Sequence, residues 1–212
     1  MTTDRDQAGR KAFEFSENLW KGGDFWELES SEFERARYAR LIEVLQGARF
    51  PRALELGCGA GYFTRLLAPQ VDHLVAYDIS PSAIARARAA GGAAATGAIA
   101  AGNAMEYAWR TDGPWDLVVM NETICYLGWL YSFFDVAWFA GEVHAATRPG
   151  GRFLMANTMD KQGYDKLLLP HIIRTYRDLF LNVGFRLDRE EIFPGTKNGV
   201  EYEVLISLFA RA

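Results

Sequence analysis

A glycine-rich turn between a short apolar run and a helical segment is the feature that most constrains how this chain can fold. Residues 52–64 read RALELGCGAGYFT, in which Gly57, Gly59 and Gly61 stand at alternate positions after Glu55. A strand that stops in such a turn and enters a helix brings backbone amides up to a ligand. The stretch therefore predicts a ligand site at the end of the first strand of an α/β sheet.

The residues around the turn restrict the kind of ligand. A dinucleotide fingerprint needs a small sixth residue, but Tyr62 stands there. Glu55 would repel a diphosphate and suit a cation, and no Gly-Lys-Ser/Thr follows, which excludes a Walker loop. S-adenosylmethionine, with its sulfonium, ammonium and carboxylate, meets these conditions.

A second apolar run supports this interpretation. Residues 74–78 read LVAYD, so that Asp78 follows Gly57 by 21 residues. An acid at the end of the second strand of a βαβ unit accepts hydrogen bonds from both ribose hydroxyls. At this point the chain resembles the class I S-adenosylmethionine-dependent methyltransferases: residues 55–61 match their first motif and Asp78 matches their ribose-binding acid.

The resemblance implies further cofactor contacts. Asn103 falls where the family has an acid or amide for the adenine amino group, and Ile79 would cover the adenine face. Tyr62 either lines the cofactor pocket or packs in the domain. The expected cofactor-binding residues are Glu55, Gly57, Cys58, Gly59, Gly61, Tyr62, Phe63, Asp78, Ile79, Asn103, Ala104, Met105 and Asn121.

Apolar and helical segments alternate along the chain, which predicts a mostly parallel sheet flanked by helices. We expect a Rossmann-like three-layer α/β sandwich: a seven-stranded sheet with an antiparallel last strand, helices on both faces and an N-terminal helical cap. Residues 1–212 are expected to form a single methyltransferase domain, with the cap at 1–47. Strands are expected at 53–56, 74–77, 98–101, 117–120, 152–156, 185–192 and 202–210. Helices are expected at 32–46, 61–68, 81–90, 130–146 and 172–183, with a loose connection within 89–101 and a hairpin loop at 194–199.

Three side chains are candidates for methyl transfer: Glu122, Tyr126 and His171. Glu122 follows the fourth strand together with Asn121, at the carboxyl edge of the sheet where such folds bind ligands. Tyr126 lies one turn further on, and His171 lies in the connection after the fifth strand, where this class often inserts acceptor-binding elements. An acceptor amine or hydroxyl must lose a proton, so Glu122, His171 and Tyr126 are the predicted catalytic residues.

Composition excludes several other classes of protein. The net charge of −4 argues against a general nucleic-acid binder, and no stretch approaches the ~18 apolar residues of a membrane span. Cys58 and Cys125 are too few and too differently placed for a disulfide framework or a zinc site, so no metal is expected. The predicted location is the cytoplasm and the predicted partner is a small molecule.

A narrower resemblance extends over most of the chain. Residues 24–26 (DFW) and 31–37 (SEFERAR) look like the start of the nodulation protein S family, whose members N-methylate the amino sugar of a deacetylated chitooligosaccharide. This implies methyl transfer to the amino or hydroxyl group of a sugar or sugar-containing metabolite. The helix expected at 130–146 is more aromatic than in that family, which indicates a thicker core, a homodimer face or a less polar acceptor pocket. The alternatives are O- or N-methylation of a less polar natural product, a cofactor-binding protein without turnover, or an oxidoreductase on a similar sheet.

Overall fold

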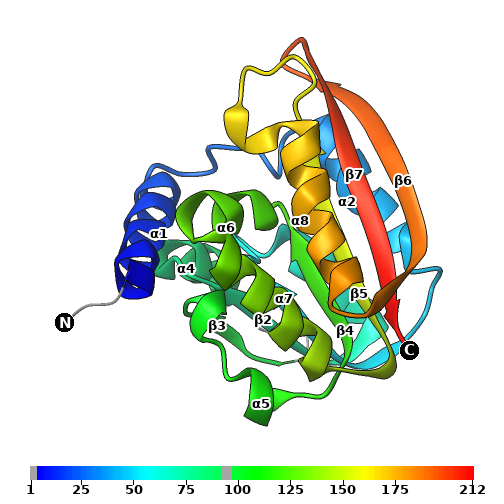
Figure 1. Ribbon diagram of the computed structural model, residues 1–212. Coiled ribbons are helices and arrows are strands. Elements are labelled where there is room, and N and C mark those ends of the chain that lie inside the picture. Colours follow the sequence, from blue (N-terminus) through cyan, green and yellow to red (C-terminus); the bar gives the residue numbers. More distant parts are fainter. Residues whose placement is uncertain (1–3, 92–96) are drawn as a thin grey trace. The chain divides into compact units, whose positions relative to one another are not determined.

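The computed structural model describes residues 4–91 and 97–212. Contacts between Cα atoms divide the chain into two compact units, of which the first ends at Tyr107 and the second begins at Ala108. Each unit contains strands and the helices that pack with them (Figure 1).

The first unit has three parallel strands in the order β3-β2-β1. These strands are β1 (Phe50–Leu56), β2 (Val71–Asp78) and β3 (Ile99–Ala101). Its helices are α1 (Asp4–Lys21), α2 (Glu32–Val44), α3 (Tyr62–Leu67) and α4 (Pro81–Ala89), with short 3-10 turns η1 (Ala68–Gln70) and η3 (Ala104–Glu106). The weak third strand is confirmed, while residues 92–96 of the expected loose connection lie outside the described residues.

Local sequence signals explain where the helices of this unit begin. Ser31 accepts a hydrogen bond from the backbone N–H of Glu34 and caps α2, and Ser80 caps α4 by accepting from Ala83. Pro81 occupies the first turn of α4, where its missing N–H costs nothing. Both caps are serines that stand directly before the first helical residue.

The second unit has four strands in the order β4-β5-β7-β6, and β7 is antiparallel to both of its neighbours. The strands are β4 (Trp115–Asn121), β5 (Thr147–Met159), β6 (Phe185–Lys197) and β7 (Val200–Arg211). The helices are α5 (Trp109–Asp112), α6 (Ile124–Leu130), α7 (Phe133–Ala146) and α8 (Pro170–Asn182), with the 3-10 turn η4 (Lys166–Leu168).

The structure corrects three of the expected boundaries. The helix expected at 130–146 begins at Phe133 as α7, because Ser132 and Asp135 form a reciprocal capping box, and a separate helix that was not expected, α6, precedes it. The hairpin loop expected at 194–199 shrinks to the turn at Asn198 and Gly199, both with positive φ, and strands β6 and β7 extend to it (Figure 1). Helix α8 begins at Pro170, so His171 lies in its first turn and not in a loop.

Seven strands and their helices confirm the predicted α/β, Rossmann-like fold with an antiparallel last strand and an N-terminal helix. In the part of the chain that the structure describes, none of the helices is long and apolar enough to cross a membrane.

Candidate functional site

The glycine-rich turn after β1 uses left-handed backbone conformations that glycine adopts readily. Gly57, Gly59 and Gly61 all have positive φ values, of 72°, 53° and 74°. The turn does not, however, present bare amides. The N–H groups of Gly57 and Cys58 both donate to the carbonyl oxygen of Tyr77, at 2.7 and 3.1 Å, and that of Gly61 donates to Cys58. The expectation of free amides was therefore wrong at these positions, because the turn closes on itself and on β2.

Asp78 is joined directly to this turn. One carboxylate oxygen accepts from the N–H of Gly59 at 2.9 Å, and the other accepts from the N–H of Ser80 at 2.9 Å. Burial raises the pKa of Asp78, against the opposing effect of the N–H donors of Ser80 and Gly59. The structure thus brings together the two motifs that the sequence separates by 19 residues.

Glu55 supplies a second buried carboxylate at the end of β1. Its side chain is almost fully buried, and within residues 4–91 and 97–212 its Oε2 atom has no hydrogen-bond partner. Burial raises the pKa of Glu55 to about 8; Thr64 opposes that rise and the charge of Asp78 adds to it. A buried carboxylate oxygen without a hydrogen-bond partner lowers the stability of the folded protein unless a ligand contacts it. A cationic ligand would favour the ionised form of this carboxylate.

Helix α1 packs across the same turn. A Cβ atom placed on Gly59 would lie 2.7 Å from Cζ2 of Trp20, whose side chain is buried. The guanidinium of Arg5 donates to the carbonyl oxygen of Met105, which lies in the turn after β3. Helix α1 therefore contacts two segments of the candidate cofactor site, the glycine turn and the turn after β3. A third contact, with the start of α4, is made by Glu17.

Glu17 fixes the middle of α1 to the start of α4. Its carboxylate accepts from the hydroxyl groups of Ser80 and Ser82, each at 2.7 Å, and from the N–H of Ser82 at 3.1 Å. Burial alone would raise its pKa, but these hydrogen bonds and Lys21 outweigh burial and lower the pKa of Glu17 to about 2. A carboxylate at the first turn of a helix also interacts favourably with the helix dipole.

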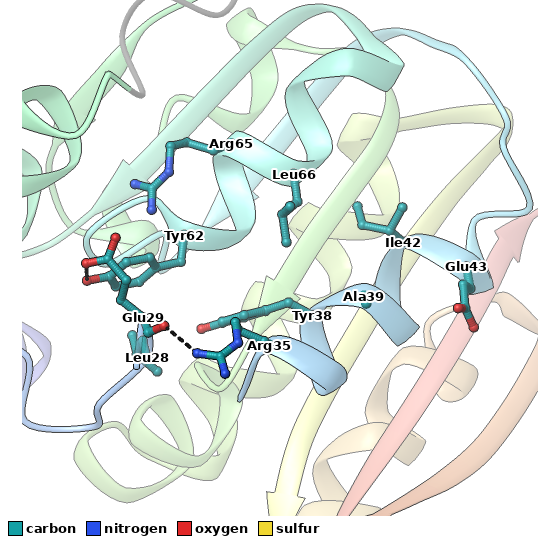
Figure 2. A pocket seen from close by; sticks show the side chains of 10 residues that line it. All are labelled: Leu28, Glu29, Arg35, Tyr38, Ala39, Ile42, Glu43, Tyr62, Arg65 and Leu66. Carbon is teal, nitrogen blue, oxygen red and sulfur yellow. Dashed lines mark hydrogen bonds between the residues drawn. The ribbon is translucent and has the colours of Figure 1, made fainter. Parts of the chain in front are cut away.

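Tyr62 lines a pocket of about 580 Å³ beside α2 and α3 (Figure 2), and its side chain also packs against a cluster that includes Ala60 of the glycine turn and Trp20. Its hydroxyl lies 3.5 Å from Asp24 Oδ2 and 3.4 Å from Glu29 Oε2, and the guanidinium of Arg65 lies 4.8 Å from its ring centre. Burial and the two carboxylates raise the pKa of Tyr62 to about 12. Whether Tyr62 also lines the cofactor pocket stays a prediction.

The remaining candidate residues of the first unit occupy varied positions. Cys58 and Phe63 are buried, with Cys58 in a cluster with Ala76, Ile84, Ala87 and Ile99 and the Phe63 ring 6.0 Å from that of Tyr38. Asn103 accepts from the N–H of Met105 at 3.0 Å and caps η3. Ile79 and Ala104 are half-buried and Met105 is buried.

The catalytic candidates all lie in the second unit. Glu122 has a positive φ of 52°, and its carboxylate accepts from the N–H of Thr158 at 2.9 and 3.0 Å and from its hydroxyl at 2.7 Å. Asn121 and Tyr126 are half-buried at the end of β4 and on α6, whereas His171 is exposed in the first turn of α8. The structure thus fixes Glu122 tightly and leaves His171 accessible.

Sequence reasoning missed the residues that hold α1 and Glu122 in place: Glu17, Trp20, Ser80, Ser82 and Thr158. Glu17 and Trp20 are three residues apart and therefore share one face of α1, which is a readable signal. Their partners are far away in the sequence, and nothing local identifies them.

The chain matches the family model described as nodulation protein S (NodS) over residues 13–132. It is 31% identical over 139 residues to nodulation protein S of Rhizobium tropici, an alignment that covers 65% of this chain and 56% of that protein. It is 34% identical over 134 residues to nodulation protein S of Bradyrhizobium diazoefficiens, covering 59% and 54%. The chain therefore spans about half the length of the curated relatives it matches.

Solved structures share the fold. The N-methyltransferase NodS from Bradyrhizobium japonicum, in complex with S-adenosyl-L-homocysteine, superposes with a TM-score of 0.77 at 22% identity, covering 94% of this chain and 98% of that one. A methyltransferase-like protein from Bacillus halodurans superposes with a TM-score of 0.64 at 14% identity, covering 84% and 100%.

Proposed function

This chain belongs to the nodulation protein S family, and from that premise we propose that it is an S-adenosylmethionine-dependent methyltransferase whose acceptor is the amino group of a small sugar. The family membership and the fold of an N-methyltransferase both support methyl transfer. A relative described as an N-methyltransferase supports an amine as the acceptor, and the resemblance to the nodulation protein S family supports an amino sugar.

The cofactor proposal rests on one observation: the glycine turn lies between two buried carboxylates, and one of them has an unpartnered oxygen. Glu55 would hold the cationic methionine end of the cofactor, because its Oε2 atom has no hydrogen-bond partner among the described residues. Asp78 would hold the ribose, and the turn after β3, with Asn103 and Met105, would hold the adenine. S-adenosylmethionine supplies a methyl group on a sulfonium, which needs no further activation as a leaving group.

The protein itself must bind the cofactor and the acceptor, exclude water from the site and accept one proton from the acceptor. Trp20 covers the glycine turn and is itself buried, so water has little access at Gly59. A neutral amine attacks directly, but an ammonium must first lose a proton to a base. We assign that role to Glu122 or His171, with Tyr126 and Asn121 orienting the acceptor.

We also propose that the protein works in the cytoplasm. Cys58 and Cys125 are both free thiols, which is the usual state of cysteines in a reducing compartment.

Calorimetric binding tests the cofactor assignment. S-adenosylhomocysteine should bind to the wild type and at least ~10-fold more weakly to Asp78→Asn, because a charged acceptor of hydrogen bonds is lost. Asp72→Asn is the matched control, since Asp72 lies on the same strand but pairs with Arg49 on the surface. Binding of NAD in place of S-adenosylhomocysteine, or equal affinities for both variants, would refute the assignment.

Turnover measurements test the acceptor and the base. Methyl transfer to a glucosamine oligomer should exceed transfer to its N-acetylated form and to a catechol. If Glu122 takes the proton, Glu122→Gln should lower kcat ~10²-fold or more and leave cofactor affinity intact, whereas Glu201→Gln, at an exposed position on β7, should leave kcat unchanged. A raised acceptor KM with full kcat would mean that Glu122 only orients the acceptor.

A further inference from the structure

The pocket beside α2 and α3 has two chemically different parts (Figure 2). The part around Tyr62 is lined by charged side chains, which are Glu29, Arg35 and Arg65. The other part is lined mainly by apolar side chains, which include Ala39, Ile42 and Leu66. The volume of about 580 Å³ lies within the range of ~300–1,000 Å³ that is typical of small-molecule sites. A ligand with a charged group and an apolar side therefore matches the walls of this pocket.

Two carboxylates flank the hydroxyl of Tyr62 at the charged part of the pocket. The phenol oxygen lies 3.5 Å from Asp24 Oδ2 and 3.4 Å from Glu29 Oε2, but it carries one proton and donates it to one acceptor at a time. Among the residues that the structure describes, Asp24 Oδ1 is buried without a hydrogen-bond partner, and neither carboxylate forms an ion pair. The two carboxylates therefore offer more acceptor oxygens than their surroundings supply donors.

The two guanidinium groups of the pocket donate to backbone carbonyl groups. Arg35 Nη1 donates to the carbonyl oxygens of residues 29 and 30, just before α2, at 3.1 and 2.8 Å. Arg65 Nη1 donates to the carbonyl oxygen of Ala60 at 3.4 Å. Both arginines thus hold segments that border the pocket, whereas the two carboxylates share a single phenol proton. This difference favours a cationic donor over an anion as the ligand.

The pocket shares a wall with the glycine turn. Tyr62 is the first residue of α3, directly after Gly61, and its side chain packs against the cluster that contains Ala60 and Trp20. A ligand that contacts the Tyr62 hydroxyl is therefore one side chain away from the turn that would hold the methyl donor.

We propose that this pocket is a subsite for a second, non-reacting amino-sugar unit of the methyl acceptor, an inference that rests on the proposed function. The ammonium group of this unit has three N–H donors and donates to Glu29, while the Tyr62 proton turns to Asp24. The C–H groups of the sugar ring contact the apolar part of the pocket. The amine that receives the methyl group belongs to the neighbouring sugar unit, beside the glycine turn.

Steady-state methyl transfer to glucosamine and to its trimer tests the subsite. The trimer should have the lower KM, and Glu29→Gln should lower the ratio of kcat/KM for the trimer to kcat/KM for the monosaccharide ~5–10-fold. The change should lie in the KM for the trimer, because the lost hydrogen bond holds a unit that does not react. Glu32→Gln is the matched control, since it removes the same charge from an exposed position of α2 outside the pocket and should leave the ratio unchanged.

A second variant tests the apolar part without changing charge. Ala39 is exposed and lines the pocket, so the ring of Ala39→Trp should fill it and lower the same ratio. Equal KM values for trimer and monosaccharide, or a ratio insensitive to both Glu29→Gln and Ala39→Trp, would overturn the subsite and leave the proposed function in place. No methyl transfer to either glucosamine would overturn both. Calorimetric binding of inorganic phosphate that is lost in Arg35→Gln would overturn the subsite in favour of an anionic ligand.

Discussion

Adding one methyl group at Gly59 should reveal how firmly α1 packs on the glycine turn. Gly59 has a φ of 53°, so alanine there costs ~1–2 kcal/mol for its left-handed backbone. The new Cβ would also lie 2.7 Å from Cζ2 of Trp20, a distance that requires the ring or the helix to shift, at a further ~1–3 kcal/mol. Gly59→Ala should therefore lower the free energy of unfolding by ~2–5 kcal/mol.

Two comparisons separate these contributions. Gly47 has a φ of 65° and open space around its Cα, so Gly47→Ala should cost only the ~1–2 kcal/mol of the backbone. Trp20→Ala alone should cost ~3–5 kcal/mol, because it removes a buried ring. In that background Gly59→Ala should again cost only ~1–2 kcal/mol, which corresponds to a coupling of ~1–3 kcal/mol between the two sites.

Urea unfolding followed by far-ultraviolet circular dichroism gives all five free energies of unfolding, for the wild type and the four variants, without depending on tryptophan fluorescence. Equal costs for Gly59→Ala and Gly47→Ala, with no coupling to Trp20, would show that α1 does not pack on the turn.

Four further predictions concern the buried polar groups of the first unit. Folding lowers the pKa of Glu17 to about 2. The ionised carboxylate therefore stabilises the folded protein above pH ~4.5, and this stabilisation is lost as the pH falls towards 2. In Glu17→Gln, the free energy of unfolding measured with urea should depend less on pH over this range. Folding raises the pKa of Glu55 to about 8. As the pH rises from ~4.5 to 8, Glu55 therefore loses its proton in the unfolded state before it does so in the folded state, and the free energy of unfolding falls. Glu55→Gln should abolish this fall. Calorimetry in two buffers at pH 7 should also show proton release when S-adenosylmethionine binds, absent in Glu55→Gln. Ser80→Ala removes the cap of α4 and a donor to Glu17, and should lower the free energy of unfolding by ~2 kcal/mol; no change in the urea midpoint would contradict the observed contacts.

Much of the fold could be predicted because its signals are local. The apolar runs, the glycine turn and Asp78 lie within short stretches, and all seven strands appeared near their expected positions. The break between α6 and α7 was also readable, since Ser132 and Asp135 have the spacing of a capping box, but the continuous aromatic pattern masked it. Pro194 suggested a loop, yet it lies within β6, which is an edge strand and tolerates a missing N–H.

The site was less predictable because its key contacts join distant residues. The glycine turn was located correctly, but its amides donate within the chain, and only three-dimensional closure on Tyr77 shows this. Whether Glu55, Asp78, Glu122, Tyr126 and His171 act as proposed stays a prediction. The family resemblance, by contrast, is confirmed by the match over residues 13–132.

The contact between Glu17 and the start of α4 also has a consequence for synthesis on the ribosome. Ser80 and Ser82 follow Glu17 by 63 and 65 residues. At ~5–20 residues per second, the nascent chain carries α1 for ~3–13 s before the hydroxyl groups that hold Glu17 have even been made. During that interval Trp20 has no glycine turn to cover. Helix α1 is therefore made before the strands of its unit and is among the last segments of that unit to reach a final position.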